Sequence, residues 1–368
     1  MTEKVNWKDV FLFGGAVMGS VAGAGFASGQ EVMQFFTHLG FAGSVGAGLV
    51  SMALLSWLTM TILEDGRTCQ FHNVNAIFTY YCGSKMGLFF EWFVPTLMLM
   101  AVSIMISAAG AAVNEHYGWH PAVGRTLMAL LALTTVLLGL KQMVRIVGSI
   151  APFFIAFTIL MGLASILENP EGIAASSLAL ETLPVPRAYS NWFVSGMMYA
   201  SFLLVGLMPF TAGVGRQARQ KADTCWGGLF AGFFFLAGAI ILSTGLLVQI
   251  PLVYDRQIPS LAMTANSFPP GASLFALLML VGIYTASVSM LWTAVNRVQP
   301  DEKKLSYRAA ATVMALLAYF GGHLQFSTMV GIVYPAVGYL GLVLIGGMIL
   351  TKSKQGHLLP GRKKDTPS

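Results

Sequence analysis

The stretch GSVAGAGFASGQE, residues 19–31, decides the fold, because it places a run of glycines and an acid inside an otherwise apolar helix. Gly19, Gly23, Gly25 and Gly29 weaken a helix, since glycine loses more backbone entropy on folding than other residues. Apolar, helix-like sequence flanks the stretch on both sides. We therefore expect a helix that breaks in its middle, exposing carbonyls of its first half and N–H groups of its second half.

The composition makes the lipid bilayer the solvent of that helix. The chain has 368 residues, of which 56% are hydrophobic and 10% charged, whereas soluble domains are about 25% charged. Apolar runs of about 20 residues, the length that crosses a bilayer, recur from end to end. The first run continues into Gln30 and Glu31 without a cleavage site, so it is expected to be retained. An all-α integral membrane protein follows.

Ten spans are predicted from these runs and the polar residues between them. They lie near residues 10–37, 42–63, 87–113, 124–140, 146–167, 191–214, 224–250, 272–296, 307–323 and 328–350. With both termini in the cytoplasm, all but Arg125, Arg187 and Arg256 of the 21 basic residues are cytoplasmic. This bias predicts that orientation in the cytoplasmic membrane, and it accounts for the net charge of +6 without a nucleic-acid partner.

The ten spans divide into two sets of five, and because five is odd the second set has inverted topology. The predicted repeats cover about residues 8–167 and 188–350 of a single transmembrane domain, followed by a cytoplasmic tail at 351–368. Each repeat has one long connection, at 64–86 or 251–271, with a short apolar stretch that is expected to be helical. These stretches are Val74–Tyr81 and Pro259–Ala265.

Span 6 carries helix-breaking residues at a depth similar to those of span 1: Gly206, Pro209 and Gly213. Paired interruptions in matching positions indicate the binding site of a transporter. Two simpler interpretations remain: close helix packing for the glycines and a proline kink for Pro209.

Glu31 also has two interpretations. Ser28 and Glu31 have the spacing of a capping box at the start of the second half-helix. An acid at membrane depth, on the other hand, commonly marks an ion or substrate path. A capping carboxylate beside a cavity would satisfy both.

Two further spans carry polar stripes. The stripe of span 8 consists of Thr285, Ser289, Thr293 and Asn296. Its side chains either bond to their own helix or face a polar path and supply oxygen ligands to a hard cation. The stripe of span 3 is a weaker candidate for a cavity wall: Thr96, Ser103, Ser107 and Asn114. Glu91, near the cytoplasmic end of span 3, is expected to reach the interface.

Signals of an enzyme are missing from the sequence. The six histidines form no HExxH motif, and no phosphate loop or nucleophile elbow is present. We therefore predict a membrane protein that moves or senses a solute and is not an enzyme.

Residues 21–36, VAGAGFASGQEVMQFF, closely resemble the first-span signature of the bacterial YkvI family of membrane proteins. The length and the ten-span layout agree over nearly the whole chain. YkvI proteins are similar to the amino acid, polyamine and organocation transporter superfamily, whose members have the LeuT-like inverted-repeat fold. The resemblance implies a secondary carrier for a small, amino-acid-like solute.

The implied substrate site lies at the breaks of spans 1 and 6, with span 3 as a wall. Its residues are Gly23, Ala24, Gly25, Phe26, Ser28, Gly29, Gln30, Glu31, Gly206, Pro209, Ser103 and Ser107. Sodium-coupled relatives imply an ion site, and no other cofactor is expected. Its ligands would be the carbonyls of Gly19 and Ala22 and the hydroxyls of Thr285 and Ser289.

Proton coupling is the alternative to sodium. Some proton-coupled relatives have a lysine in span 5, and residues 146–167 contain none, so Glu31 would be the first candidate. An alternative function is a nutrient receptor, because membrane subunits of spore germinant receptors have a similar length and span number.

Overall fold

The computed structural model describes residues 5–256, 258–323 and 326–355, and their regular structure is helical throughout. Ten helical segments match the ten predicted spans. They are α1 to α3 (Trp7–Val21, Ala24–Ser28 and Gln30–Phe35), α4 (Gly40–Cys69), α5 (Ile77–Tyr117), α6 (Pro121–Leu137), α7 (Leu140–Glu168), α9 (Trp192–Gly215), α10 (Lys221–Val248), α13 (Ala272–Val298), α14 (Leu305–Gly321) and α15 (Phe326–Lys354). The all-α class is confirmed.

Within the described residues, seven helical stretches are long and apolar enough to cross a membrane, and α6 is a shorter apolar helix. The break shortens α1 to 15 residues, and α14 has 17. Both are below the roughly 20 residues that a full crossing needs. Many large apolar side chains point outward, as a hydrocarbon solvent allows: Leu127, Leu130, Phe153, Leu167, Leu316, Leu317 and Phe320.

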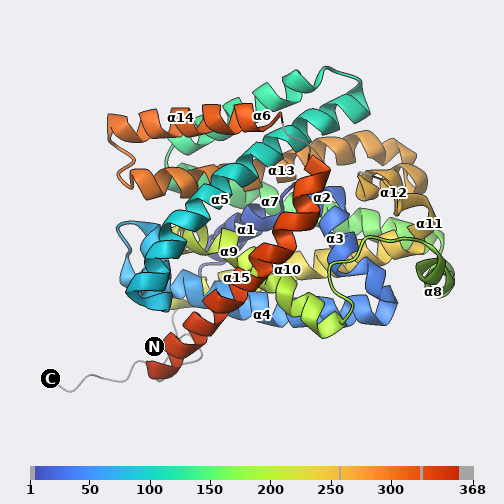
Figure 1. The fold of residues 1–368 in the computed structure, drawn as a ribbon, viewed down its shortest axis with the longest axis horizontal. Coiled ribbons are helices and arrows are strands. Elements are labelled where there is room, and N and C mark those ends of the chain that lie inside the picture. The colour runs from blue at the N-terminus through green and yellow to red at the C-terminus, as the bar shows by residue number, and fades with distance from the viewer. Residues whose placement is uncertain (1–4, 257, 324–325, 356–368) are drawn as a thin grey trace.

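Contacts between helices have the symmetry of the predicted five-plus-five repeat. Each helix of the first repeat has a counterpart five spans later. The contact of α1 with α7 corresponds to that of α9 with α15, and the contact of α5 with α6 corresponds to that of α13 with α14. The pairs α4 with α9 and α10 with α1 are related in the same way. Figure 1 shows α6 and α14 together along one edge of the molecule, while α1 and α9 lie nearer its middle.

The break predicted in span 6 is not present. Helix α9 runs from Trp192 to Gly215 with Pro209 inside it, so the proline is accommodated as a residue of a continuous helix. A Cβ at Gly213 would lie 2.6 Å from the ring of Trp292, whereas one at Gly206 would lie 3.4 Å from the end of Met98, an ordinary contact. Close packing therefore accounts for Gly213 and not for Gly206.

Both long connections contain the expected short helices. Residues Val74–Ala76 form the 3-10 helix η2, and α5 begins at Ile77, turning at Gly83, whose φ of +71° favours glycine. In the second connection, α12 spans Pro259–Ser267, between α11 (Ile250–Val253) and η3 (Pro269–Gly271). Besides α11 and η3, two further elements are additional to the prediction: η1 (Thr37–Leu39) and α8 (Gly172–Thr182).

Polar contacts join loops that the sequence places on the same face. Among the predicted cytoplasmic segments, Asn6 N–H bonds Asp223 at 2.9 Å, and Gln70 reaches the carbonyl of Arg216. The Gln30 side chain, in the outer half of predicted span 1, bonds the carbonyl of Arg256 in the predicted external connection at 2.6 Å. The grouping agrees with the predicted alternation of the loops, and which group faces the cytoplasm stays a prediction.

The carboxylate of Glu91 is held by protein groups, and its place at the membrane interface stays a prediction. Thr79 donates to Glu91 at 2.5 Å, and the guanidinium of Arg297 lies 3.5 Å from it. Arg297 also stacks over the ring of Trp92, 4.1 Å from the ring centre. These contacts join the end of α13 to α5.

Candidate functional site

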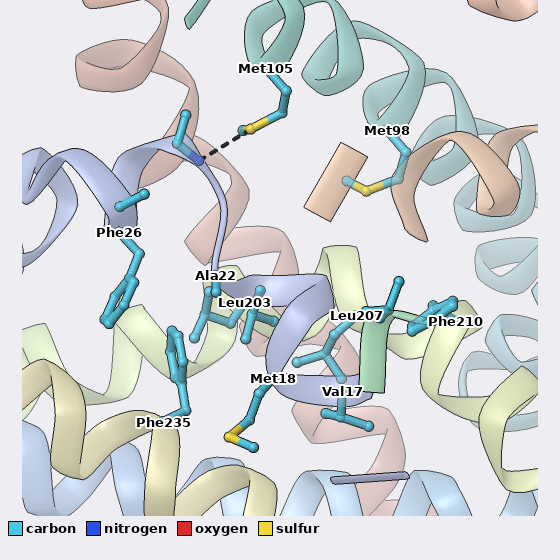
Figure 2. Packing of buried hydrophobic residues seen from close by; sticks show 14 of the residues in the cluster. Val17, Met18, Ala22, Phe26, Met98, Met105, Leu203, Leu207, Phe210 and Phe235 are labelled. Atoms are coloured by element: carbon cyan, nitrogen blue, oxygen red, sulfur yellow. Dashed lines mark hydrogen bonds between the residues drawn. The ribbon is translucent and has the colours of Figure 1, made fainter. Parts of the chain in front are cut away.

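The predicted break in span 1 is confirmed at Ala22 and Gly23. Helix α1 ends at Val21, Ala22 has a ψ of 51°, and Gly23 is extended before α2 begins at Ala24. Figure 2 shows the chain crossing this gap between the two helical segments. A second interruption follows at Gly29, which is left-handed with a φ of +82°.

Met105 of α5 contacts the first residue of α2, directly after the break. The Ala24 N–H, which has no partner inside its own helix, donates to the Met105 sulfur at 3.2 Å (Figure 2). Gly23 makes room for this contact, since a Cβ there would lie 3.2 Å from the terminal carbon of Met105. Its φ of −75° is open to other residues, so space and not backbone conformation favours glycine at this position.

A cavity lies beside the break, between α1, α3, α5, α9, α13 and α15. Three of the predicted site residues line it: Gly23, Glu31 and Gly206. The space open to the centres of water molecules is about 70 Å³, room for about five waters. This is small for a binding site, so only a small solute fits the cavity in this conformation.

Most of the cavity wall is apolar, and sequence reasoning missed it. Four methionines line it, Met98, Met100, Met105 and Met290, together with leucines of α5 and α9. The chain has 21 methionines, and those of the cavity have no distinguishing spacing. Only the juxtaposition of α5, α9 and α13 identifies them.

Glu31 is the one ionisable side chain among the described residues that line the cavity. It is 3% exposed, and the hydroxyl of Tyr199 in α9 donates to its Oε1 at 2.6 Å. The capping box is wrong, because Gly29 and not Ser28 holds the N-cap position of α3. The Ser28 hydroxyl donates to the Gly25 carbonyl at 3.2 Å and accepts a 3.4 Å hydrogen bond from the Gln30 N–H.

Other predicted site residues support the break from behind the cavity. Phe26 packs against Phe154 of α7 and Phe235 of α10. Gly29 touches α12, because a Cβ there would lie 3.1 Å from the Ser260 nitrogen, and the Ser260 hydroxyl donates to the Ala27 carbonyl at 2.7 Å. These contacts fix α2 against its neighbours.

The remaining predicted residues lie away from the cavity. Ser103 bonds its own helix at 3.4 Å and faces Gly321 of α14. Neither Ser107 nor Pro209 is among the lining residues. The lining face of α5 carries Leu97, Met98 and Met105 instead, so the hydroxyls of span 3 mark a different side of that helix.

The sodium ligands inferred from related transporters are partly brought together. Gly19 lies against Thr285, since a Cβ at Gly19 would be 3.2 Å from the Thr285 Cβ. Thr285 donates to the Gly282 carbonyl at 2.9 Å, and Ser289 donates to the Ala286 carbonyl at 2.8 Å. Both hydroxyl protons are therefore used within α13, which leaves oxygen lone pairs for a cation.

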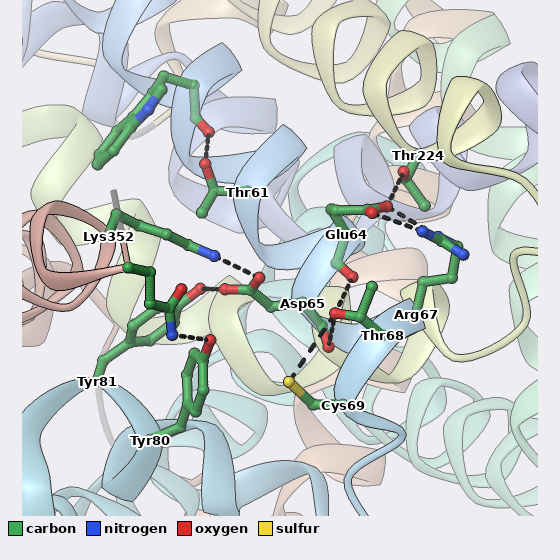
Figure 3. Close-up of polar contacts among 12 residues, drawn as sticks. Thr61, Glu64, Asp65, Arg67, Thr68, Cys69, Tyr80, Tyr81, Thr224 and Lys352 are labelled. Atoms are coloured by element: carbon green, nitrogen blue, oxygen red, sulfur yellow. Dashed lines mark hydrogen bonds and ion pairs between the residues drawn. The ribbon is translucent and has the colours of Figure 1, made fainter. Parts of the chain in front are cut away.

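A second polar cluster lies where α4 and α15 end (Figure 3). Asp65 of α4 forms an ion pair with Lys352 of α15 at 2.5 Å and accepts a hydrogen bond from Tyr81 of α5. The preceding residue, Glu64, pairs with Arg67 at 2.6 Å and accepts from Thr224 of α10 at 2.8 Å. The cluster ties four helices together at one end of the molecule.

No family model matches the chain, but two proteins of Bacillus subtilis (strain 168) are similar to it over nearly their whole length. The membrane protein YkvI is 24% identical over 347 residues, 93% of this chain and 96% of YkvI. YyaD is 20% identical over 346 residues, 91% of this chain and 94% of YyaD. These similarities make the chain a relative of YkvI.

Solved transporters share the fold. A nucleobase-cation-symport-1 family transporter, Mhp1, superposes with a TM-score of 0.62 at 13% identity, covering 94% of this chain and 78% of Mhp1. A Na⁺-coupled sialic acid symporter gives 0.62 at 11%, covering 95% and 85%. MhsT in complex with L-phenylalanine gives 0.60 at 15%, covering 95% and 89%. The chain therefore has the LeuT-like fold of these transporters.

Proposed function

We propose that the chain is a secondary transporter that binds a small, amino-acid-like solute in the cavity beside the break of span 1. The observation that carries the proposal is the cavity itself: it adjoins an interrupted helix and contains a buried acid among apolar walls. An acid buried among apolar helices is costly and commonly has a role in transport. A site at a discontinuous helix, near the interface of two repeats, suits alternating access.

The fold and the relatives support this proposal. The structural neighbours are transporters of unrelated solutes. The identity of the solute must therefore be inferred from the residues that line the cavity of this chain. We propose that transport is driven by sodium or protons, with Gly19, Ala22, Thr285 and Ser289 as the sodium ligands or Glu31 as the proton carrier. The protein would act in the bacterial cell membrane with both termini in the cytoplasm.

The test is transport by the purified protein in proteoliposomes. A panel of amino acids, amines and osmolytes is first screened by thermal unfolding, because ligands that bind the native state raise its apparent stability. Compounds that stabilise the protein are then assayed for accumulation under sodium and proton gradients. Accumulation supports the proposal. Stabilising ligands that neither accumulate nor exchange across the membrane would contradict it and favour the receptor.

A further inference from the structure

The chemistry of the cavity is one-sided. Among the described residues that line it, Glu31 is the one acid, and no lysine, arginine or histidine is present. In the part of the chain that the structure describes, one side chain, Tyr199, donates to the Glu31 carboxylate. A carboxylate has about four acceptor positions. The cavity therefore has unused acceptor capacity and favours a guest that brings a positive charge and N–H donors.

The backbone group that would suit a negative charge is already occupied. The Ala24 N–H at the break donates to the Met105 sulfur, and Met105 itself lines the cavity. A guest carboxylate would lie near the Glu31 carboxylate without a basic partner, and burying an unpaired charge is unfavourable. Ser20, the other polar side chain in the wall, donates to the Val17 carbonyl at 2.7 Å. Its oxygen is thus left to accept a hydrogen bond from a guest.

The rest of the wall suits an apolar body. Met98 and Met105 present flexible thioether side chains near Leu203 and Leu207 (Figure 2). Met290 of α13 also lines the cavity. Methionine adapts its shape to irregular apolar surfaces. The volume for about five waters limits the guest to a few carbon atoms in this conformation.

Building on the transport function proposed above, we propose that the substrate is a small organic monocation: an ammonium group on an apolar body of a few carbons. The ammonium group binds the Glu31 carboxylate and the Ser20 oxygen, and the body lies among the methionines. This narrows the amino-acid-like solute proposed above to a compound that keeps the amino group and lacks the carboxylate, for which the described wall has no basic partner.

The experiment measures thermal unfolding of the full-length purified protein with matched compounds. Primary amines from ethylamine to hexylamine are compared with the alcohols, carboxylates and α-amino acids of the same carbon skeletons. Amines are expected to raise the unfolding temperature, and the other three classes are not. Equal stabilisation by the alcohols, stronger stabilisation by the amino acids, or no stabilisation by any amine would overturn the inference.

Glu31→Gln provides the test at the residue, because glutamine keeps an oxygen that can accept from Tyr199 but removes the charge. Amine binding should weaken about tenfold or more, since charge-assisted hydrogen bonds are about twice as strong as neutral ones. Glu168→Gln makes the same change at the exposed end of α7 and should leave binding unaltered. Unchanged amine affinity in Glu31→Gln would contradict the proposal. If this variant does not fold, the charge preference of the wild-type protein decides.

Proteoliposomes separate failure of this inference from failure of the transport function. Accumulation of an amino acid or an anion, with no binding of amines, would contradict the monocation substrate but support the transport function. Amines that bind through Glu31 but never cross the membrane would contradict the transport function and support the monocation as a ligand.

Discussion

At the scale of single residues, glycines that look alike in the sequence have different surroundings. A Cβ at Gly206 would meet only the flexible end of Met98, at 3.4 Å, on the cavity side of α9. A Cβ at Gly48 of α4 would lie 2.2 Å from Ile240 of α10. The first glycine leaves open space, whereas the second permits two helices to approach.

Gly206→Leu is therefore expected to fill the cavity and abolish ligand binding while the folded yield stays near that of the wild type. Gly48→Leu should instead lower the folded yield, because overpacking costs about 1–3 kcal/mol and here separates two helices. Size-exclusion chromatography measures the yield, and thermal shift with the best ligand measures binding. Equal loss of folded protein in both variants would assign Gly206 to packing.

The hydroxyls of Thr285 and Ser289 define a second prediction at this scale. Although both donate within α13, their oxygens can still bind sodium, a hard cation that prefers oxygen ligands. Substrate affinity is expected to fall about tenfold or more when choline replaces sodium, and Thr285→Val with Ser289→Ala should remove this dependence. Binding assays at fixed pH and ionic strength provide the measurement. Sodium dependence that survives the double substitution would exclude this site and leave Glu31 as the coupling candidate.

At the scale of elements, the interrupted first span is held in place by contacts on both sides. Gly29 separates α2 from α3 with a left-handed backbone, and α12 packs against the interruption through Ser260. Its counterpart α9 is unbroken. The two repeats therefore contribute differently to the site: one supplies a break, the other a continuous wall with Gly206.

Gly29→Ala should destabilise the protein by more than the about 1–2 kcal/mol that a left-handed conformation costs a residue with a side chain. The added Cβ would also press on the Ser260 nitrogen, 3.1 Å away. Gly118→Ala is the matched control, because Gly118 has a φ of +68° but open space around its Cβ. Thermal unfolding compares the two. If Gly29→Ala lowers the stability no more than Gly118→Ala does, the contact with α12 does not restrict the side chain at position 29.

At the scale of the whole molecule, several helix contacts of one repeat have a counterpart in the other, and the loops gather at two ends. Figure 1 shows the first turns of α5 and helix α8 at opposite ends of the molecule. The end that holds the start of α5 also holds the Asp65 to Lys352 ion pair, so the basic residues there have defined partners as well as a role in orientation.

Single cysteines at Ser84 and Asn169, in a background without the three native cysteines, test which end faces the cytoplasm. Both positions are exposed. We expect an impermeant thiol reagent to label position 169 in intact cells, and position 84 only after the cells are opened, because the basic bias places the α5 start inside. Labelling of position 84 alone in intact cells would reverse the orientation.

The sequence by itself determined the solvent, the ten helical segments and a break within the glycine-rich stretch of span 1. These features depend on local composition: apolar runs of sufficient length form helices in lipid, and a glycine-rich stretch weakens a helix wherever it lies. Only the tertiary structure decided that α9 stays continuous, that Glu31 meets Tyr199 across 168 residues and that methionines line the cavity. In a membrane, residues that face lipid and residues that face a dry cavity are equally apolar, so no periodicity separates them. Those contacts are decided by the packing of distant helices.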